Sequence, residues 1–309
     1  MLKLEHADTA KLGFVQGWGM ASMPKTITDR IEQLKWYIRK TAELGGGVVQ
    51  FSGMPEDWND RKLKEVKEVL EETNIAIEIA CHVFGGWTIL GSLAGENKSE
   101  VRALVDAQIK SAHFLGTRII RSSYGKMCVR YSRYNKSYPL KEHIKYMVDT
   151  LKETARICEG EDLYFGLENH ADFTGREFAQ IYEEVGSKRV GCTLDTANGF
   201  TVFSDANDDI EALAPWAITT HIKDIKIEDT DPAQGWVPMI PRGCPIGEGN
   251  VNIPRALELL DQQAPFKEEL HLVLEQSWMN YDGVKDRAKY DEECLHRGLR
   301  YVKSLLGRV

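Results

Sequence analysis

Four side chains that could bind a metal ion each stand directly after a short apolar run of this sequence. These side chains are Glu168, Asp195, His221 and Glu275, and the runs before them are residues 163–167, 190–194, 217–220 and 270–274. A buried parallel strand has this appearance, and its carboxyl end is where α/β folds place their reactive groups. Because the pattern recurs four times, we expect the four side chains to meet at one site.

Three carboxylates and one imidazole at one site require a compensating positive charge. Like charges a few ångströms apart do not all ionise unless a cation lies between them. Mixed oxygen and nitrogen ligands suit Mn²⁺, Mg²⁺, Co²⁺ or Zn²⁺, with a position left for substrate oxygens. We therefore predict one divalent ion, Mn²⁺ first among these, bound by Glu168, Asp195, His221 and Glu275. A set of salt bridges without a metal ion is the alternative.

Strand-like and helix-like segments alternate along the chain and would position these ligands. Strands are expected at residues 12–18, 48–51, 75–81 and 117–121 and before each of the four ligands. Helices are expected at 28–44, 60–72, after 97–100, at 139–158, after 174–177, at 206–214, after 252–254 and at 284–306. This order predicts an α/β fold, a single (β/α)8 TIM barrel domain over residues 1–309. A doubly wound sheet is the runner-up, but no Gly-x-Gly-x-x-Gly follows the first strand.

Two helix starts carry local signals. Thr174-Gly175-Arg176-Glu177 is a capping box, in which the Thr and Glu side chains each bond the backbone of the other. Asn97-Lys98-Ser99-Glu100 has the same form with Asn in place of Thr. Both predict a helix that begins at the following residue.

Three loops that follow strands are expected to be long and to choose the substrate. They cover residues 83–96, 122–138 and 223–251, after strands three, four and seven, and they are rich in aromatic side chains. Long loops in a compact domain are often lids or binding loops. The predicted substrate contacts on this rim are His82, Trp87, Asn169, Lys223 and Trp236. For Lys223, a local ion pair with Asp224 is the simpler interpretation.

The composition excludes several classes of protein. The chain has 309 residues, of which 42% are hydrophobic and 28% charged, with a formal net charge of −8. This balance argues against a nucleic-acid partner, which would need a basic surface. No apolar run is long enough to span a membrane, and no signal peptide is apparent. The six cysteines form no Cys-x-x-Cys pair. Reduced thiols in a cytoplasmic protein are therefore expected.

The motifs of the second half resemble the xylose-isomerase-like barrel superfamily of sugar (phosphate) isomerases and epimerases. The matching stretches are Leu167-Glu168-Asn169, Leu194-Asp195-Thr196-Ala197-Asn198, His221-Ile222-Lys223-Asp224, Ile246-Gly247-Glu248-Gly249 and Leu274-Glu275. Within this superfamily the chain is similar to ketose 3-epimerases, inosose dehydratases and the alpha subunits of C-glycoside deglycosidases. The resemblance implies that Glu168, Asp195, His221 and Glu275 bind one divalent metal ion.

The resemblance also implies a mechanism. The metal ion would bind the carbonyl and hydroxyl oxygens of a sugar and stabilise an enediolate. Glu168 and Glu275 would remove and return the proton next to the carbonyl, and His170 would orient a hydroxyl or shuttle a proton. The expected partner is a small-molecule sugar or keto glycoside. A homo-oligomer is expected, with or without a small partner subunit.

Three other functions remain as alternatives to an isomerase or epimerase. A lyase or dehydratase would take the same proton from a keto sugar and then expel a leaving group. A metal-dependent endonuclease resembles this fold but uses additional histidines, and Asn198 stands where one of them would be. A non-enzymatic binding protein would not need the acid and base pair at all.

Overall fold

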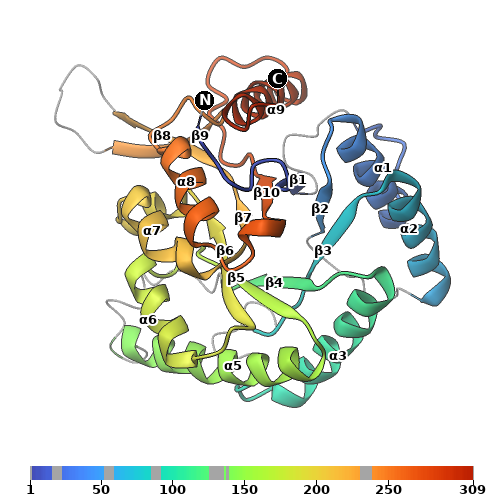
Figure 1. Cartoon of the computed structure of the whole chain (residues 1–309), viewed down its shortest axis with the longest axis vertical. Helices are drawn as coiled ribbons and strands as arrows, with labels where there is room; N and C mark the ends of the chain where they lie inside the picture. The colour runs from blue at the N-terminus through green and yellow to red at the C-terminus, as the bar shows by residue number, and fades with distance from the viewer. Residues whose placement is uncertain are drawn as a thin grey trace.

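Within the part of the chain that the structure describes, eight parallel strands form one sheet that closes into a barrel (Figure 1). The computed structural model describes residues 2–15, 23–51, 59–84, 92–124, 136, 139–229 and 239–308. The strands are β1 (Lys11–Val15), β2 (Val48–Phe51), β3 (Ala76–Ala80), β4 (Ile119–Ser123), β5 (Tyr164–Glu168), β6 (Val190–Asp195), β7 (Ala217–His221) and β10 (His271–Leu274). Each was expected from the sequence, and residues 16–18 of the predicted first strand lie outside the described residues.

The sheet order is β10-β1-β2-β3-β4-β5-β6-β7. Ile222 closes the ring, because it pairs with Leu274 and its backbone bonds both sides of that residue. The Ile222 N–H donates to Val273 O at 2.7 Å, and the Glu275 N–H donates to Ile222 O at 3.0 Å. The fold is therefore the predicted TIM barrel and not an open doubly wound sheet.

Helices surround the strands on the outside (Figure 1). They are α1 (Arg30–Glu43), α2 (Asp60–Thr73), α3 (Lys98–Leu115), α5 (Leu140–Gly160), α6 (Gly175–Val185), α7 (Ala206–Leu213), α8 (Ile253–Gln263) and α9 (Arg287–Leu305). Short 3-10 turns cover Asn198–Val202, Ala214–Trp216 and Lys267–Glu269. The apolar faces of the helices pack on the outer face of the sheet and form one continuous hydrophobic core with it. No helix of the described residues has the length and apolar character needed to cross a membrane.

The two predicted helix starts have different outcomes. Thr174 forms the complete capping box with Glu177, and α6 begins at the next residue. Asn97 precedes α3 but makes no side-chain cap bond, so that part of the prediction is wrong. Its Oδ1 instead accepts a hydrogen bond from the Ser92 N–H at 3.2 Å and ties the preceding turn to the helix.

The inside of the barrel contains both apolar and polar side chains. A small apolar cluster of Val15, Val48 and Val273 fills part of it. Gly13 leaves room for this cluster, since a Cβ there would lie 2.4 Å from a methyl group of Val48. Side chains with polar atoms, including Gln50 and Glu78, are fully buried in the same interior. Such groups are stable there only when they bond one another.

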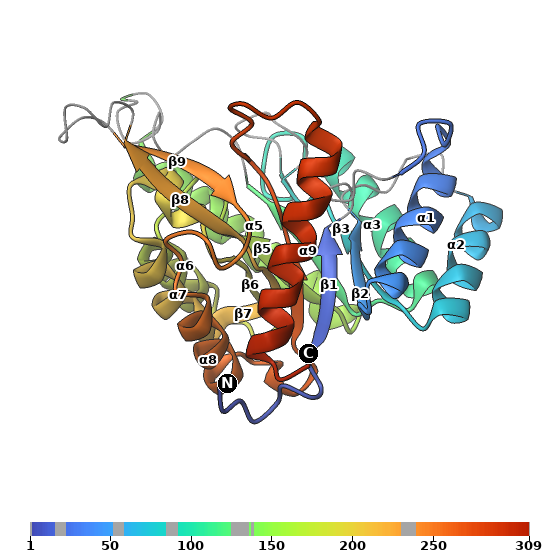
Figure 2. The same cartoon turned by 90° about the horizontal axis from the view of Figure 1, so that it is seen from above.

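The predicted long loop after strand seven contains an antiparallel hairpin, which the sequence did not indicate. Its strands are β8 (Asp224–Asp229) and β9 (Met239–Cys244). Figure 2 shows this hairpin at the carboxyl end of the barrel strands, opposite the end where both chain termini lie. Residues 85–91 and most of 125–138, which belong to the other two predicted loops, lie outside the described residues.

Candidate metal centre

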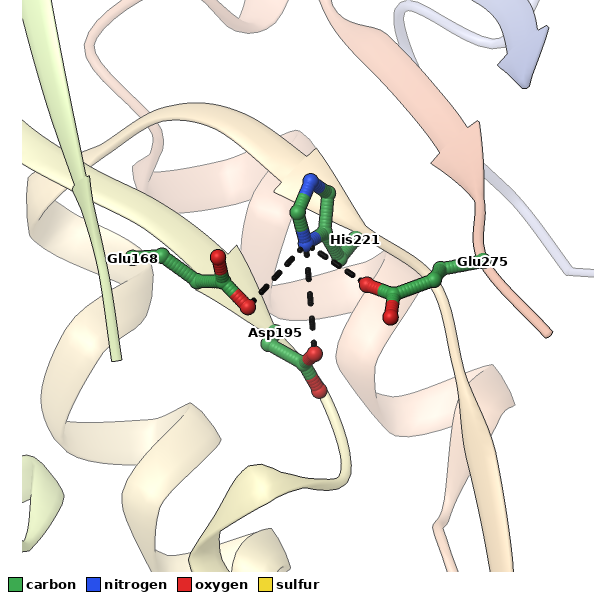
Figure 3. Close-up of side chains that lie close together, drawn as sticks. All are labelled: Glu168, Asp195, His221 and Glu275. Carbon is green, nitrogen blue, oxygen red and sulfur yellow. Dashed lines mark ion pairs between the residues drawn. The ribbon is translucent and has the colours of Figure 1, made fainter. Parts of the chain in front are cut away.

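The four predicted ligands stand at the same end of neighbouring strands. Glu168, Asp195 and His221 are the last residues of β5, β6 and β7, and Glu275 directly follows β10. The register pairs Asp195 with His221, so these two lie side by side. Figure 3 shows the imidazole of His221 facing all three carboxylates, with Glu168 and Glu275 on either side. Barrel closure therefore brings together residues that are far apart in the sequence.

The donor atoms lie close enough to share one ion. His221 Nδ1 lies 2.8 Å from Glu275 Oε2, 3.4 Å from Glu168 Oε1 and 3.9 Å from Asp195 Oδ2. One donor atom from each of the four residues lies within 4.8 Å of the others, and all four residues are buried. This mixture of oxygen and nitrogen donors fits a hard or borderline divalent cation.

Two further observations show that these residues fit a metal ion. The other ring nitrogen of His221, Nε2, lies 2.6 Å from Gln50 Oε1 and so is already engaged. Among the described residues, Asp195 Oδ2, His221 Nδ1 and Glu275 Oε2 are buried atoms that contact one another or Lys223 as ion pairs but form no hydrogen bond of good geometry. A cation between them would satisfy all three.

The charges at the site shift the pKa values of its own members. Burial alone would lower the pKa of His221, but Glu168 and Glu275 outweigh it and raise this pKa to about 9. Burial would raise the pKa of Glu168, but His221 and His170 lower it to about 2. In the metal-free protein a charged imidazole therefore compensates for the carboxylates. A metal ion must displace that proton to use Nδ1.

Lys223 supplies a second positive charge at the same place. Its Nζ lies 2.5 Å from Asp195 Oδ2 and 3.5 Å from Glu275 Oε1, and it donates to Asn198 Oδ1 at 2.9 Å. Burial lowers the pKa of Lys223, but Asp195 and the two glutamates raise it above its usual range. Three carboxylates and one ammonium together carry two net negative charges. One divalent ion beside a neutral imidazole would balance them.

The predicted ion pair between Lys223 and Asp224 is wrong. The Asp224 carboxylate instead accepts four backbone hydrogen bonds, from residues 225, 247, 249 and 251. Gly249 is required there, because a Cβ would lie 2.2 Å from Asp224 Oδ1. Gly247 has a φ of +94°, as expected for a residue that shapes a turn. Asp224 therefore anchors residues 247–251 beneath the hairpin. Lys223 instead contacts the carboxylates of the metal centre.

Asn169 and His170 follow Glu168 but have different surroundings. Asn169 accepts from the Asp195 N–H at 2.7 Å and donates to Asp195 O at 2.9 Å. Both ends of its amide are thus used to hold the end of β6. His170 is half-buried, and its Nδ1 has no hydrogen-bond partner among the described residues. This nitrogen is enclosed by the surrounding protein.

The other predicted substrate contacts divide into two groups. His82 follows β3, and Gln108 of α3 binds it twice, through the His82 N–H at 2.9 Å and through Nδ1 at 2.5 Å. Burial lowers the pKa of His82, so its ring is neutral at pH 7. Trp87 and Trp236 lie outside the described residues.

Sequence reasoning missed two residues that contact the ligand set. Asn198 donates to Glu168 Oε1 at 3.2 Å and accepts from Lys223, so it links a glutamate to the ammonium. In the sequence, Asn198 ended one of the matching stretches and marked a departure from a nuclease motif, but it was given no role at the metal centre. Gln50 bonds His221 from β2, and the signal for it was an amide in the middle of an apolar strand.

Trp278 is a third residue that the sequence did not single out. Lys223 Nζ lies 4.4 Å from the centre of its indole ring, and 43% of the residue is exposed. Its φ of +57° is rare for a bulky side chain and marks a backbone held by its surroundings. Trp278 O accepts from the Gly243 N–H at 2.9 Å, so the hairpin fixes this segment. The ring forms an aromatic surface beside the metal centre.

Comparisons with known proteins agree with this fold. Residues 38–297 match the family model described as xylose isomerase-like TIM barrel. No curated protein sequence matches the chain.

Three solved structures illustrate the similarity. A xylose isomerase-like TIM barrel protein from Mycobacterium smegmatis, in complex with magnesium, has a TM-score of 0.67 at 15% identity, with 98% of each chain covered. A D-psicose 3-epimerase, solved in the presence of D-fructose, has a TM-score of 0.67 at 16% identity, with 96% of this chain and 99% of the other covered. A 3-keto-D-glucoside 4-epimerase from E. coli has a TM-score of 0.65 at 15% identity, with 94% and 99% covered. At these identities the likeness shows the fold alone.

Proposed function

Because this chain belongs to the xylose isomerase-like TIM barrel family, we propose that it is a divalent-metal-dependent sugar isomerase or epimerase. The observation that carries this proposal is the pair Glu168 and Glu275, which lie on either side of His221 in a buried set of metal donors. Two carboxylates on opposite sides of a substrate suit removal and return of one proton. The sugar chemistry of the similar structures supports the same choice.

Glu168, Asp195, His221 and Glu275 would hold the metal ion, with Mn²⁺ or Mg²⁺ our first choices. When bound, a divalent ion supplies Lewis acidity that stabilises the negative charge of an enediolate. Three of these four residues are carboxylates, each with one negative charge. A divalent cation balances this charge better than a monovalent cation does.

The acid and base roles belong to the two glutamates. One takes the proton from the carbon next to the carbonyl, and the other returns a proton to the opposite face. Asn198 holds Glu168 at Oε1, and Lys223 lies beside Glu275 Oε1, so each carboxylate has a fixed neighbour. His170, half-buried and two residues after Glu168, would orient a substrate hydroxyl.

A specific observation favours elimination from a keto glycoside as a second candidate. The exposed ring of Trp278 lies beside Lys223, where it could stack on a second ring attached to the sugar. Proton removal next to the ketone would be the same, and the glycosidic group would then leave. This candidate uses the same glutamates and differs only in the fate of the intermediate.

Solvent exchange tests both candidates. The protein with Mn²⁺ or Mg²⁺ is incubated in D₂O with free ketoses and with 3-keto glycosides, and NMR follows deuterium at the carbon next to the carbonyl. An isomerase or epimerase gives exchange together with a new sugar, whereas a lyase gives a released aglycone. Absence of exchange with every sugar and both ions would contradict the proposal.

Two substitutions test the acid and base roles. Glu168→Gln and Glu275→Gln should each lower kcat by at least about a thousandfold, because the amide cannot take a proton. Glu248→Gln is the matched control, since this glutamate is exposed and pairs with Arg297. The control should keep wild-type activity. A glutamine variant that keeps full activity would remove that glutamate from the mechanism.

A further inference from the structure

A chain of buried side chains continues from His221 down into the barrel. His221 Nε2 lies 2.6 Å from Gln50 Oε1, and Gln50 Nε2 donates to Glu78 Oε2 at 2.8 Å. The second carboxylate oxygen, Glu78 Oε1, accepts from Thr219 Oγ1 at 2.8 Å and lies 2.5 Å from His271 Nδ1. These residues come from four different strands, β7, β2, β3 and β10. Three of them are fully buried, namely Gln50, Glu78 and Thr219.

The chain has only one consistent direction. Burial would raise the pKa of Glu78, but His271 and Thr219 outweigh it and lower this pKa, so the carboxylate is charged. A charged carboxylate accepts hydrogen bonds and cannot donate them. Gln50 must therefore turn its NH₂ group toward Glu78 and its carbonyl oxygen toward His221. The nitrogen that faces that oxygen, His221 Nε2, must in turn carry a proton.

We propose that Gln50 and Glu78 are positioning residues that hold His221 with Nε2 protonated and Nδ1 free to bind the metal ion. They thereby set the affinity of the centre for divalent ions. This inference rests on the proposed function only in its premise that the four-residue set binds a metal ion.

The physical reason lies in the competition at the other nitrogen. Three carboxylates face Nδ1, with Glu275 Oε2 only 2.8 Å away, and they favour a proton on that nitrogen. A neutral ring with its proton on Nδ1 could not bind an ion there. The bond to Gln50 makes that form costly, because Gln50 Oε1 would then face an unprotonated Nε2 in a buried place. Partners of this kind change metal affinity by about 10–100-fold when they are removed.

Gln50→Leu is the direct test, because leucine fills similar space and accepts no hydrogen bond. Isothermal titration with Mn²⁺ alone should show an affinity about 10–100-fold weaker than that of the wild type. The exchange of both residues, Gln50→Glu with Glu78→Gln, restores an acceptor for His221 and a donor from residue 78 to residue 50. That double variant should bind Mn²⁺ within about threefold of the wild type, whereas Gln50→Glu alone places two carboxylates side by side and should not.

A spectroscopic measurement separates tautomer control from simple packing. In the Zn²⁺-bound wild type, the ¹⁵N NMR signals of His221 should show a protonated Nε2 and a metal-bound Nδ1. In Gln50→Leu, the Nε2 proton should exchange faster with water, because its acceptor is gone. A merely space-filling role for Gln50 would leave this signal unchanged.

Asp209→Asn is the matched control. Asp209 is a buried carboxylate that accepts from Gly175 N–H and Ser204 Oγ, and these two bonds do not involve any of the four metal ligands, Gln50 or Glu78. It should lower stability to urea without changing Mn²⁺ affinity. The inference would be overturned if Gln50→Leu bound Mn²⁺ as tightly as the wild type, or if the double variant did not regain Mn²⁺ affinity. Neither result would contradict the proposed metal centre. A folded wild type that binds no divalent ion would instead overturn the metal centre itself.

Discussion

His221 is the residue on which most contacts of the site converge. One ring nitrogen faces three carboxylates, and the other faces Gln50 inside the barrel. The surrounding carboxylates make the imidazole a better base than usual, so protons compete with metal ions for the same nitrogen. The affinity of the centre should therefore depend on pH.

The pH dependence has a definite sign. The pKa of His221 is raised to about 9, so each bound ion displaces one proton at any pH below that value. Burial raises the pKa of Asp195 to about 6, against the influence of Lys223, and a second proton is displaced below that pH. We expect Mg²⁺ affinity to rise about tenfold per pH unit between pH 6.5 and 8.5. Titration calorimetry in buffers of different ionisation enthalpy counts the protons, and an affinity independent of pH would refute this prediction.

Trp278 should contribute to substrate binding and not to proton transfer. Its exposed ring lies beside Lys223, and stacking on a sugar is worth about 1 kcal/mol. Trp278→Ala should raise KM by about fivefold to tenfold and change kcat little, whereas Trp278→Phe should stay close to the wild type. Steady-state kinetics on whichever sugar shows exchange provides the measurement. A large loss of kcat with an unchanged KM would assign Trp278 a different role.

At the scale of elements, the hairpin β8–β9 is attached to the barrel at both ends. Asp224 at its start binds four backbone N–H groups, and Gly243 near its end lies against residues 277–278. A Cβ on Gly243 would lie 1.8 Å from Ser277 O, so no other residue fits without movement. The hairpin therefore fixes the segment that carries Trp278.

Asp224→Ala tests this attachment. The substitution leaves up to four backbone donors without an acceptor, two of them in buried bonds, and we expect the free energy of unfolding to fall by about 3 kcal/mol. Asp229→Ala, at the exposed end of β8, is the control and should change stability by less than about 0.5 kcal/mol. Urea denaturation followed by circular dichroism measures both. Equal stability of the two variants would show that the carboxylate of Asp224 is not an anchor.

The sequence predicted the elements that end at the site better than those that surround it. Each strand that carries a ligand is a short, mostly apolar and almost entirely buried run that stops at the ligand, although β6 and β7 contain threonines. The hairpin has no such signal, since β9 contains Pro241 and Gly243 and is only partly buried. Its pairing depends on contacts with residues 277–279, which no local pattern encodes.

At the scale of the whole molecule, barrel closure is what creates the metal centre. The strands β5, β6 and β7 are consecutive, but Glu275 joins them only because β10 bonds the end of β7. The same closure buries three carboxylates, which Lys223 and a charged His221 compensate only in part. A bound divalent ion should therefore stabilise the entire fold.

This stabilisation can be measured by melting. At an ion concentration of 100 times Kd, binding contributes about 2.7 kcal/mol, and Tm should rise by about 5 °C relative to protein in EDTA. His221→Ala should be folded but show no such rise, because it lacks the nitrogen ligand. An identical Tm with and without Mn²⁺ and Mg²⁺ in the wild type would contradict the prediction.

The sequence by itself determined the strand and helix order, the barrel, and the four residues that gather at its mouth. Apolar runs and helical periodicity are local properties, and the end of a parallel strand lies where the run ends. Only the tertiary structure decided the partners of those residues: Lys223 with Asp195 and not Asp224, Gln50 behind His221, and Trp278 over Lys223. These contacts join residues distant in the sequence, and the closure and register of the barrel set them.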